Sequence, residues 1–124
     1  MRYQSKQYVR WDDLDAFGHV NNAKYLTYAQ EARFAWSGIL EMVVARAEVD
    51  FIAPIYDGDS FVDVELWVSA IGTSSFSVTY EMKLKGEVVA RVKTVQVTVD
   101  MKTKQSHPIS TEQREFLNKY LETE

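Results

Sequence analysis

The stretch DDLDAFGHVNNAKYLTYAQEARFAWSGIL, residues 12–40, begins with clustered polar residues and continues with regularly spaced apolar residues. Residues 12–22 hold three aspartates, one of the two histidines of the chain and a pair of asparagines. From Tyr25 onward, apolar residues recur at intervals of three and four, the spacing of one helix face. They are Tyr25, Tyr28, Ala29, Ala32, Ala35, Trp36 and Ile39. The stretch therefore predicts a polar turn leading into a long helix that ends near Gly38.

Beyond the predicted helix, between Val43 and Val99, the apolar residues follow a period of two. Residues 61–68 and 76–84 alternate apolar and polar side chains, as strands with one buried face do. Lys85 and Gly86 predict a tight hairpin, because glycine tolerates a positive φ angle. This part of the chain therefore predicts successive antiparallel strands.

Three further segments complete the predicted secondary structure. Residues 88–99 are rich in valine and threonine, which favours a strand. A loose alternation near the N-terminus predicts a short first strand. Residues 111–121 predict a short terminal helix capped by Ser110 or Thr111, and Ser110 stands three residues before Gln113, as in a capping box.

These elements predict an α+β fold in a single domain, residues 1–124. The expected order is β-α-β-β-β-β plus a short C-terminal helix, with the long helix packed against a five-stranded antiparallel sheet. Such a sheet has exposed edge strands in so small a domain. We therefore expect a homodimer that pairs sheet edges and forms clefts between subunits, where ligands often bind. Pairing of two such dimers into a homotetramer is left open by the sequence.

The composition excludes several classes of function. The 124 residues carry a net charge of -4, which argues against nucleic acid as a partner. The absence of cysteine removes thiolate chemistry and cysteine zinc sites, and the two histidines lack the spacing of a metal motif. No segment has the length of a membrane span, and the N-terminus lacks the apolar core of a secretory signal. We expect a cytoplasmic protein that needs neither a metal nor a cofactor.

The polar residues of segment 12–22 have two interpretations. Aspartate, asparagine and glycine are typical of turns and helix caps, so the plainer one is a capped turn. However, six polar side chains converge just before a helix start, which presents unpaired N–H groups and the positive end of the helix dipole. Such a helix start can polarise a carbonyl oxygen while a nearby carboxylate attacks or activates water. A carboxylate is a weak base, so this chemistry suits an activated substrate such as a thioester.

The segment VRWDDLDAFGHVNNAKYLTYAQEAR resembles the N-terminal signature of the hotdog-fold acyl-CoA thioesterases, especially the 4-hydroxybenzoyl-CoA thioesterase-like branch. Its features are Asp-x-Asp, then Gly-His-Val-Asn-Asn, then a tyrosine three positions on. The segments VDFIAPIYDGD and IGTSSFSVTYEM resemble two further landmarks of that family. The resemblance covers roughly residues 5–100 and implies hydrolysis of an acyl-CoA thioester to a free acid and CoA.

The resemblance implies three catalytic residues. Asp15, the second acid of Asp-x-Asp, is the nucleophile or general base. The backbone amide of Asn22 polarises the thioester carbonyl. His19 is a general acid or base, or positions the substrate, with an ordinary loop histidine as the alternative. The other residues placed against the substrate are Asp13, Gly18, Val20, Asn21, Tyr25, Ser74 and Ser75.

Several assignments stay open at this point. Asp13 is also expected as a structural partner of the loop, and Tyr25 as part of the helix core. Glu31 is a possible auxiliary carboxylate or an ordinary solvated side chain. The candidates for contact with the nucleotide phosphates of CoA are Lys83, Lys85, Arg91, Lys102 and Lys104.

Two other functions compete with acyl-CoA hydrolysis. Plant acyl-carrier-protein thioesterases share the His-Val-Asn-Asn motif, but they have a functional asparagine where this chain has Phe17, which weakens that reading. A non-catalytic acyl-CoA binding module is the second alternative, because a fold does not fix a function. Retention of both acids of Asp-x-Asp argues against a pure binder.

Overall fold

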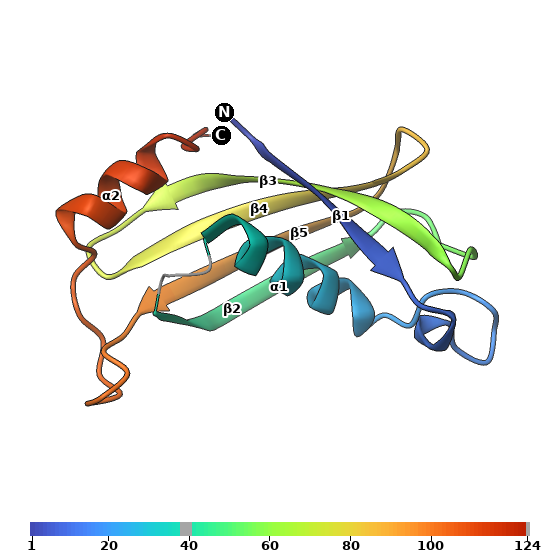
Figure 1. Ribbon diagram of the computed structural model, residues 1–124, viewed down its shortest axis with the longest axis horizontal. Helices are drawn as coiled ribbons and strands as arrows, with labels where there is room; N and C mark the ends of the chain where they lie inside the picture. The colour runs from blue at the N-terminus through green and yellow to red at the C-terminus, as the bar shows by residue number, and fades with distance from the viewer. Residues whose placement is uncertain (38–40, 124) are drawn as a thin grey trace.

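The computed structural model describes residues 1–37 and 41–123. The predicted order of strand, helix, four strands and helix is confirmed (Figure 1). The elements are β1 (Tyr3–Val9), a 3-10 turn η1 (Trp11–Asp13), α1 (Lys24–Ser37), β2 (Met42–Phe51), β3 (Ser60–Ile71), β4 (Ser75–Leu84), β5 (Glu87–Thr98) and α2 (Thr111–Asn118). The predicted helix stop at Gly38 lies outside the described residues.

The five strands form one antiparallel sheet in the order β1-β3-β4-β5-β2, and α1 lies across one of its faces (Figure 1). The core lies between this helix and the sheet. Its largest sheet side chains are Tyr80, Phe76, Leu66 and Met82, each almost fully buried. A helix face and the alternate residues of central strands therefore meet as the apolar periodicity predicts.

One part of the predicted helix face is wrong. Ala35 is exposed, whereas Arg33 is 5% exposed and points into the core. The Arg33 guanidinium donates a hydrogen bond of 2.9 Å to the Tyr80 hydroxyl, which in turn lies 2.7 Å from the Thr94 hydroxyl. Hydroxyl groups on β4 and β5 therefore accommodate an arginine on the buried face of α1, which the apolar spacing does not predict.

The predicted hairpin joins β4 and β5, with positive φ angles at Lys85 (52°) and Gly86 (82°). A β-bulge interrupts β2 between Val44 and Arg46, so Ala45 has no partner on β5. β2 is one edge of the sheet, and its side chains are largely exposed on both faces. This edge strand is thus much less covered than β1, whose alternate residues are partly buried.

The C-terminal helix is shorter than predicted. Ser110 caps it, accepting a hydrogen bond of 3.1 Å from the Gln113 amide, as the capping box predicts. The helix ends at Asn118 because the following residues pair with β3 instead: Val68 donates to the Tyr120 carbonyl and accepts from the Glu122 amide. Among the described helices, none is long and apolar enough to cross a membrane.

Candidate active site

The loop after η1 is closed by its own backbone. The Asp15 amide donates 2.9 Å to the His19 carbonyl, and the Gly18 amide donates 3.0 Å to the Asp15 carbonyl. Gly18 has a φ angle of 82°, a conformation that favours glycine. The Asp15 carboxylate accepts 2.8 Å from the Phe17 amide, and its other oxygen lies 3.7 Å from His19 Nδ1. The loop therefore holds a carboxylate and an imidazole beside each other.

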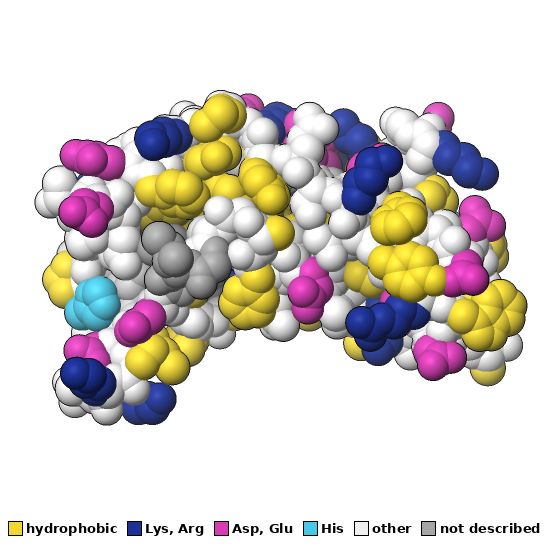
Figure 2. Space-filling view, in the orientation of Figure 1, with side chains coloured by type: hydrophobic (Ala, Val, Ile, Leu, Met, Phe, Trp, Pro, Cys, Tyr) yellow, Lys and Arg dark blue, Asp and Glu magenta, His cyan; other side chains and the backbone are white. Residues whose placement is uncertain are grey.

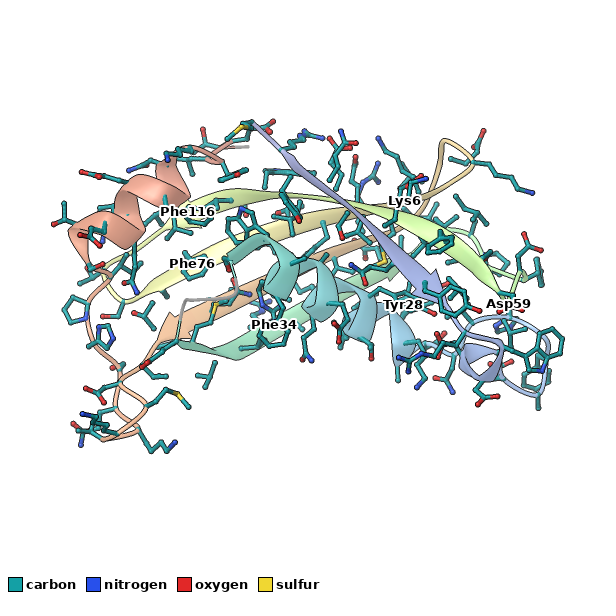
Figure 3. The ribbon with its side chains drawn as sticks, in the orientation of Figure 1. Lys6, Tyr28, Phe34, Asp59, Phe76 and Phe116 are labelled. Carbon is teal, nitrogen blue, oxygen red and sulfur yellow. The ribbon has the colours of Figure 1, made fainter. Side chains whose placement is uncertain are left out.

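Asp13 points the other way, into the protein. Its carboxylate, 5% exposed, accepts hydrogen bonds from the Arg10 amide (3.0 Å) and the Tyr28 hydroxyl (2.7 Å). Burial, and then this contact with Asp13, raise the pKa of Tyr28. Figure 3 shows Tyr28 on α1, at the side of the helix near the end of β1. Asp13 therefore fixes η1 against α1, which supports its expected structural role.

The start of α1 carries a free backbone donor. The Asn21 side chain accepts 3.0 Å from the Ala23 amide, and its carbonyl accepts 2.9 Å from the Lys24 amide. Within residues 1–37 and 41–123, the Asn22 amide donates no hydrogen bond. Because the first N–H groups of a helix also carry the positive end of its dipole, this amide can bind an oxygen that gains negative charge.

A pocket of about 170 Å³ opens beside this helix start. Four residues predicted for the site line it: His19, Val20, Asn22 and Tyr25. The opposite wall is Phe51, Ile52, Ala53 and Pro54, which were not assigned to the site from the sequence. The second quoted landmark, VDFIAPIYDGD, spans this wall and is the signal that could have found it.

Tyr25 belongs both to the pocket and to the core. Its ring is 3% exposed and meets Phe51 edge-on, with the ring centroids 5.1 Å apart. Burial raises the pKa of Tyr25, an effect that a hydrogen bond from the Ile55 backbone partly opposes. The carbonyl of Ile55 also accepts 2.8 Å from the Val20 amide, so the two walls of the pocket are tied together.

Aromatic side chains surround His19 at the rim. Its ring lies 6.3 Å from Phe17 and 6.2 Å from Tyr56, centroid to centroid. Phe17 is 84% exposed, and Figure 2 shows hydrophobic side chains among charged ones at this right-hand end of the molecule. A Cβ atom at Gly58 would lie only 3.0 Å from the Trp11 ring and 3.2 Å from its Cα, so glycine allows the β2–β3 connection to pack closely against η1.

The fold does not bring every predicted residue to this pocket. Ser74 and Ser75 lie at the β3–β4 turn, at the opposite end of the sheet from the Asp15 loop of the same chain (Figure 1). Glu31 is exposed and lines a separate pocket of about 230 Å³ together with Asp13. Across residues 1–37 and 41–123, no three His, Asp or Glu side chains are grouped as metal ligands.

The fold and this loop define a family. The family model of the Thioesterase-like superfamily matches residues 9–117, and the chain belongs to that superfamily. A structure described as a predicted thioesterase from Bacillus stearothermophilus superposes with a TM-score of 0.93 at 23% identity, covering 100% of this chain and 99% of the other. The protein is therefore a thioester hydrolase with the hotdog fold.

Particular relatives lie within this class. The chain is 27% identical to a 1,4-dihydroxy-2-naphthoyl-CoA hydrolase from Synechococcus elongatus, over 93% of this chain and 94% of the relative. It is 28% identical to the long-chain acyl-CoA thioesterase FadM from Escherichia coli, over 92% and 96%. A thioesterase from Thermus thermophilus, solved with coenzyme A and Zn, is 30% identical with a TM-score of 0.83, over 92% and 95%.

Proposed function

We propose that the protein hydrolyses an acyl-CoA thioester to a free acid and CoA. The observation that carries the proposal is the Asp15 carboxylate beside His19, because His19 lines the pocket together with Asn22, whose amide donates no hydrogen bond within the described residues. The relatives support the substrate class, since one is named for an aromatic acyl-CoA and another for long-chain acyl-CoA. Because these two acyl groups differ, the relatives do not indicate which acyl group this protein's own substrate carries.

In the proposed reaction, the thioester carbonyl oxygen accepts a hydrogen bond from the Asn22 amide. The Asp15 carboxylate then either attacks the carbonyl carbon or takes a proton from an attacking water. The carbon–sulfur bond breaks, and the CoA sulfur leaves as a thiolate that takes up a proton. Where Asp15 is the nucleophile, water then cleaves the anhydride formed between the acyl group and Asp15, which releases the free acid and restores the carboxylate. His19 is placed to position the substrate or to carry that proton. CoA enters as part of the substrate, and the proposed steps use no further cofactor or metal.

The test is the release of free thiol from short-chain, long-chain and aromatic acyl-CoAs. We expect Asp15→Asn to lower kcat/KM by about 100-fold or more, a loss of nearly 3 kcal/mol of transition-state stabilisation. The matched control is Asp12→Asn, which removes a neighbouring exposed carboxylate and should keep wild-type turnover. Full activity of a folded Asp15→Asn variant would refute the role of Asp15 as nucleophile or general base.

Two other outcomes separate the alternative functions. Binding of acyl-CoA with no turnover on any of the three substrates would favour a binding module. Turnover of acyl groups only on acyl-carrier protein would favour a carrier-dependent thioesterase. Either result would overturn the proposal of acyl-CoA as the substrate.

We also propose that the active form is a homodimer paired through β2. β2 is an uncapped edge, and the side of the strand facing α1 exposes Val44 (45%) and Phe51 (50%). Phe34, on the side of α1 nearest β2 in Figure 3, is a further exposed apolar side chain (52%). A second copy would satisfy the free strand edge and cover these side chains together. Sedimentation velocity should show a dimer that Val44→Lys converts to a monomer; a monomeric wild type would refute the pairing.

A further inference from the structure

The pocket at the start of α1 has no cation of its own for the phosphates of CoA. Its eight lining residues include no lysine or arginine. Exposed acids lie on the two segments that surround it, namely Asp12, Asp57 and Asp59. Lys24, at the helix start, lies 3.8 Å from the Asp13 carboxylate. The anionic end of a bound CoA therefore requires basic groups from elsewhere.

The bulge in β2 determines how two copies of this strand can pair. Because Ala45 is left out of the ladder, four paired residues lie on each side of Ala47. A two-fold axis at Ala47 therefore aligns the strands over their full length and places Phe51 opposite Met42 of the partner subunit. Phe51 and Met42 pair with Ala90 and Thr98 of β5, both buried, so both face the helix side of the sheet.

The intermediate pairs in this register are also chemically matched. Val49 meets Val44 of the partner subunit, again on the helix side. Glu48 meets Arg46 of the partner subunit on the other face, where opposite charges directly across from each other stabilise antiparallel strands. Within one chain, Arg46 and Glu48 already lie 2.6 Å apart, so pairing would create a four-charge cluster of alternating sign.

This register brings the end of β5 to the partner's pocket. Met42 pairs with Thr98, and neighbouring strands are about 4.8 Å apart. Thr98 thus lies two strand spacings, about 10 Å, from Phe51 of the partner subunit, which lines that subunit's pocket. The turn that follows, residues 99–107, projects beyond the β2 edge in Figure 1.

The projecting turn is a defined structure that presents two lysines. Asp100 accepts hydrogen bonds from the Lys102 amide (2.7 Å) and the Thr103 amide (3.2 Å), and its carbonyl accepts 2.7 Å from the Lys104 amide. Both lysine side chains are exposed, and within the described part of the chain neither forms an ion pair. Figure 2 shows basic side chains at the lower left, where this turn lies.

The other basic candidates are less suited. Lys83 lies 3.2 Å from Glu65, and Arg91 lies 3.1 Å from Glu81, so both are already neutralised. Lys85 is a single cation in the β4–β5 hairpin. Among these five candidates, and within residues 1–37 and 41–123, only the turn after β5 combines two lysines that form no ion pair with a position beyond the pairing edge.

We propose that Lys102 and Lys104 of each subunit bind the phosphates at the nucleotide end of a CoA thioester held in the pocket of the other subunit. This inference rests on the proposed acyl-CoA hydrolysis and on pairing through β2. The inference also places Ser74 near a substrate, because the Ser74 carbonyl accepts a hydrogen bond of 2.9 Å from the Thr98 amide at the base of the same turn. Ser74 and Ser75 then approach the substrate of the partner subunit rather than that of their own.

The first test compares an acyl-CoA with the same acyl group on pantetheine, which lacks the nucleotide. In the double variant Lys102→Glu/Lys104→Glu, the ratio of kcat/KM for acyl-CoA to that for acyl-pantetheine should fall at least 10-fold, mainly through KM for acyl-CoA. The charge-matched control Lys6→Glu/Lys119→Glu should leave this ratio unchanged. An unchanged ratio in the first variant, or an equal fall in the control or in Lys85→Glu, would overturn the inference.

The second test asks which subunit supplies the lysines. Heterodimers are prepared from one Asp15→Asn chain and one Lys102→Glu/Lys104→Glu chain. If the lysines act across the interface, the pocket with the intact Asp15 receives its lysines from the Asp15→Asn chain, where they are intact. The heterodimer should then have the wild-type KM and half of the wild-type kcat per dimer. A KM that stays raised places them on the same chain and refutes the inference. Absence of turnover by the wild type would instead refute the proposed function.

Discussion

Removal of the Tyr28 hydroxyl tests whether Asp13 anchors the catalytic loop. Tyr28 and Asp13 are 3% and 5% exposed, and their 2.7 Å hydrogen bond has little access to water. Tyr28→Phe leaves the Asp13 carboxylate with the Arg10 amide and the more distant Lys24 ammonium, 3.8 Å away. A hydrogen bond to a charged group contributes about 1.5–3 kcal/mol, so we expect a loss of about 2 kcal/mol in the free energy of unfolding.

Urea denaturation at a fixed subunit concentration measures this loss. With an m value of about 2 kcal/mol/M, the midpoint should fall by about 1 M. Tyr56→Phe, at a tyrosine that is 62% exposed, is the control and should stay within about 0.5 kcal/mol of the wild type. A double-mutant cycle with Asp13→Asn should give a coupling energy above about 1 kcal/mol. A coupling near zero would show that the contact does not hold the loop.

The same contact predicts a pH dependence. Folding raises the pKa of Tyr28 above its ordinary value of 10.0, so the folded protein favours the neutral hydroxyl. This contribution to stability is complete below the pKa of the unfolded chain, near pH 10, and is lost as the pH rises above it. The wild type should therefore lose stability more steeply than Tyr28→Phe above pH 10, and parallel curves would contradict this.

Two further perturbations address contacts away from the pocket. Tyr80→Phe removes the acceptor of the buried Arg33 guanidinium and the partner of the Thr94 hydroxyl. Thermal unfolding should therefore show a loss of about 1–3 kcal/mol in the free energy of unfolding. An unchanged melting temperature would mean that Arg33 is satisfied without Tyr80. Arg2 donates to both carboxylate oxygens of Glu122, at 2.8 and 3.1 Å, and holds the pKa of Glu122 below its ordinary value of 4.5. The contact is present above pH 4.5 and is lost as the pH falls through the pKa that Glu122 has in the folded protein. Acidification should therefore speed amide exchange in β1 of the wild type but not in β1 of Glu122→Gln.

Local signals were enough to predict most of the secondary structure. The turn at Lys85 and Gly86 requires positive φ angles, and the Ser110 cap depends on Gln113 three residues later, so both could be read from neighbouring residues. The end of α2 could not, because Leu121 leaves the helix to pair with β3, which is distant in sequence. Nor could the burial of Arg33, which depends on hydroxyl groups from two separate strands.

The candidate site also has a part that local sequence predicts and a part that depends on distant segments. The polar loop and helix start lie in one continuous segment, so the group of His19, Val20, Asn22 and Tyr25 at one pocket could be expected from the sequence. The wall from Phe51 to Pro54 comes from the end of β2, and only the register of β2 on β5 places it there. Chemical type alone also does not separate Asp13 from Asp15, since burial beside Tyr28 distinguishes the two.

The bulge at Ala45 makes one position of β2 tolerant of a change in chain length. Val44 pairs with Gln96 and Arg46 pairs with Val95, and these two partners are consecutive residues of β5. Deletion of Ala45 would therefore join two residues that already lie on opposite faces, and Met42, Val43 and Val44 would keep the faces they have now. Homologous chains can accordingly differ in length by one residue at this point of the edge strand without moving an apolar side chain to the other face.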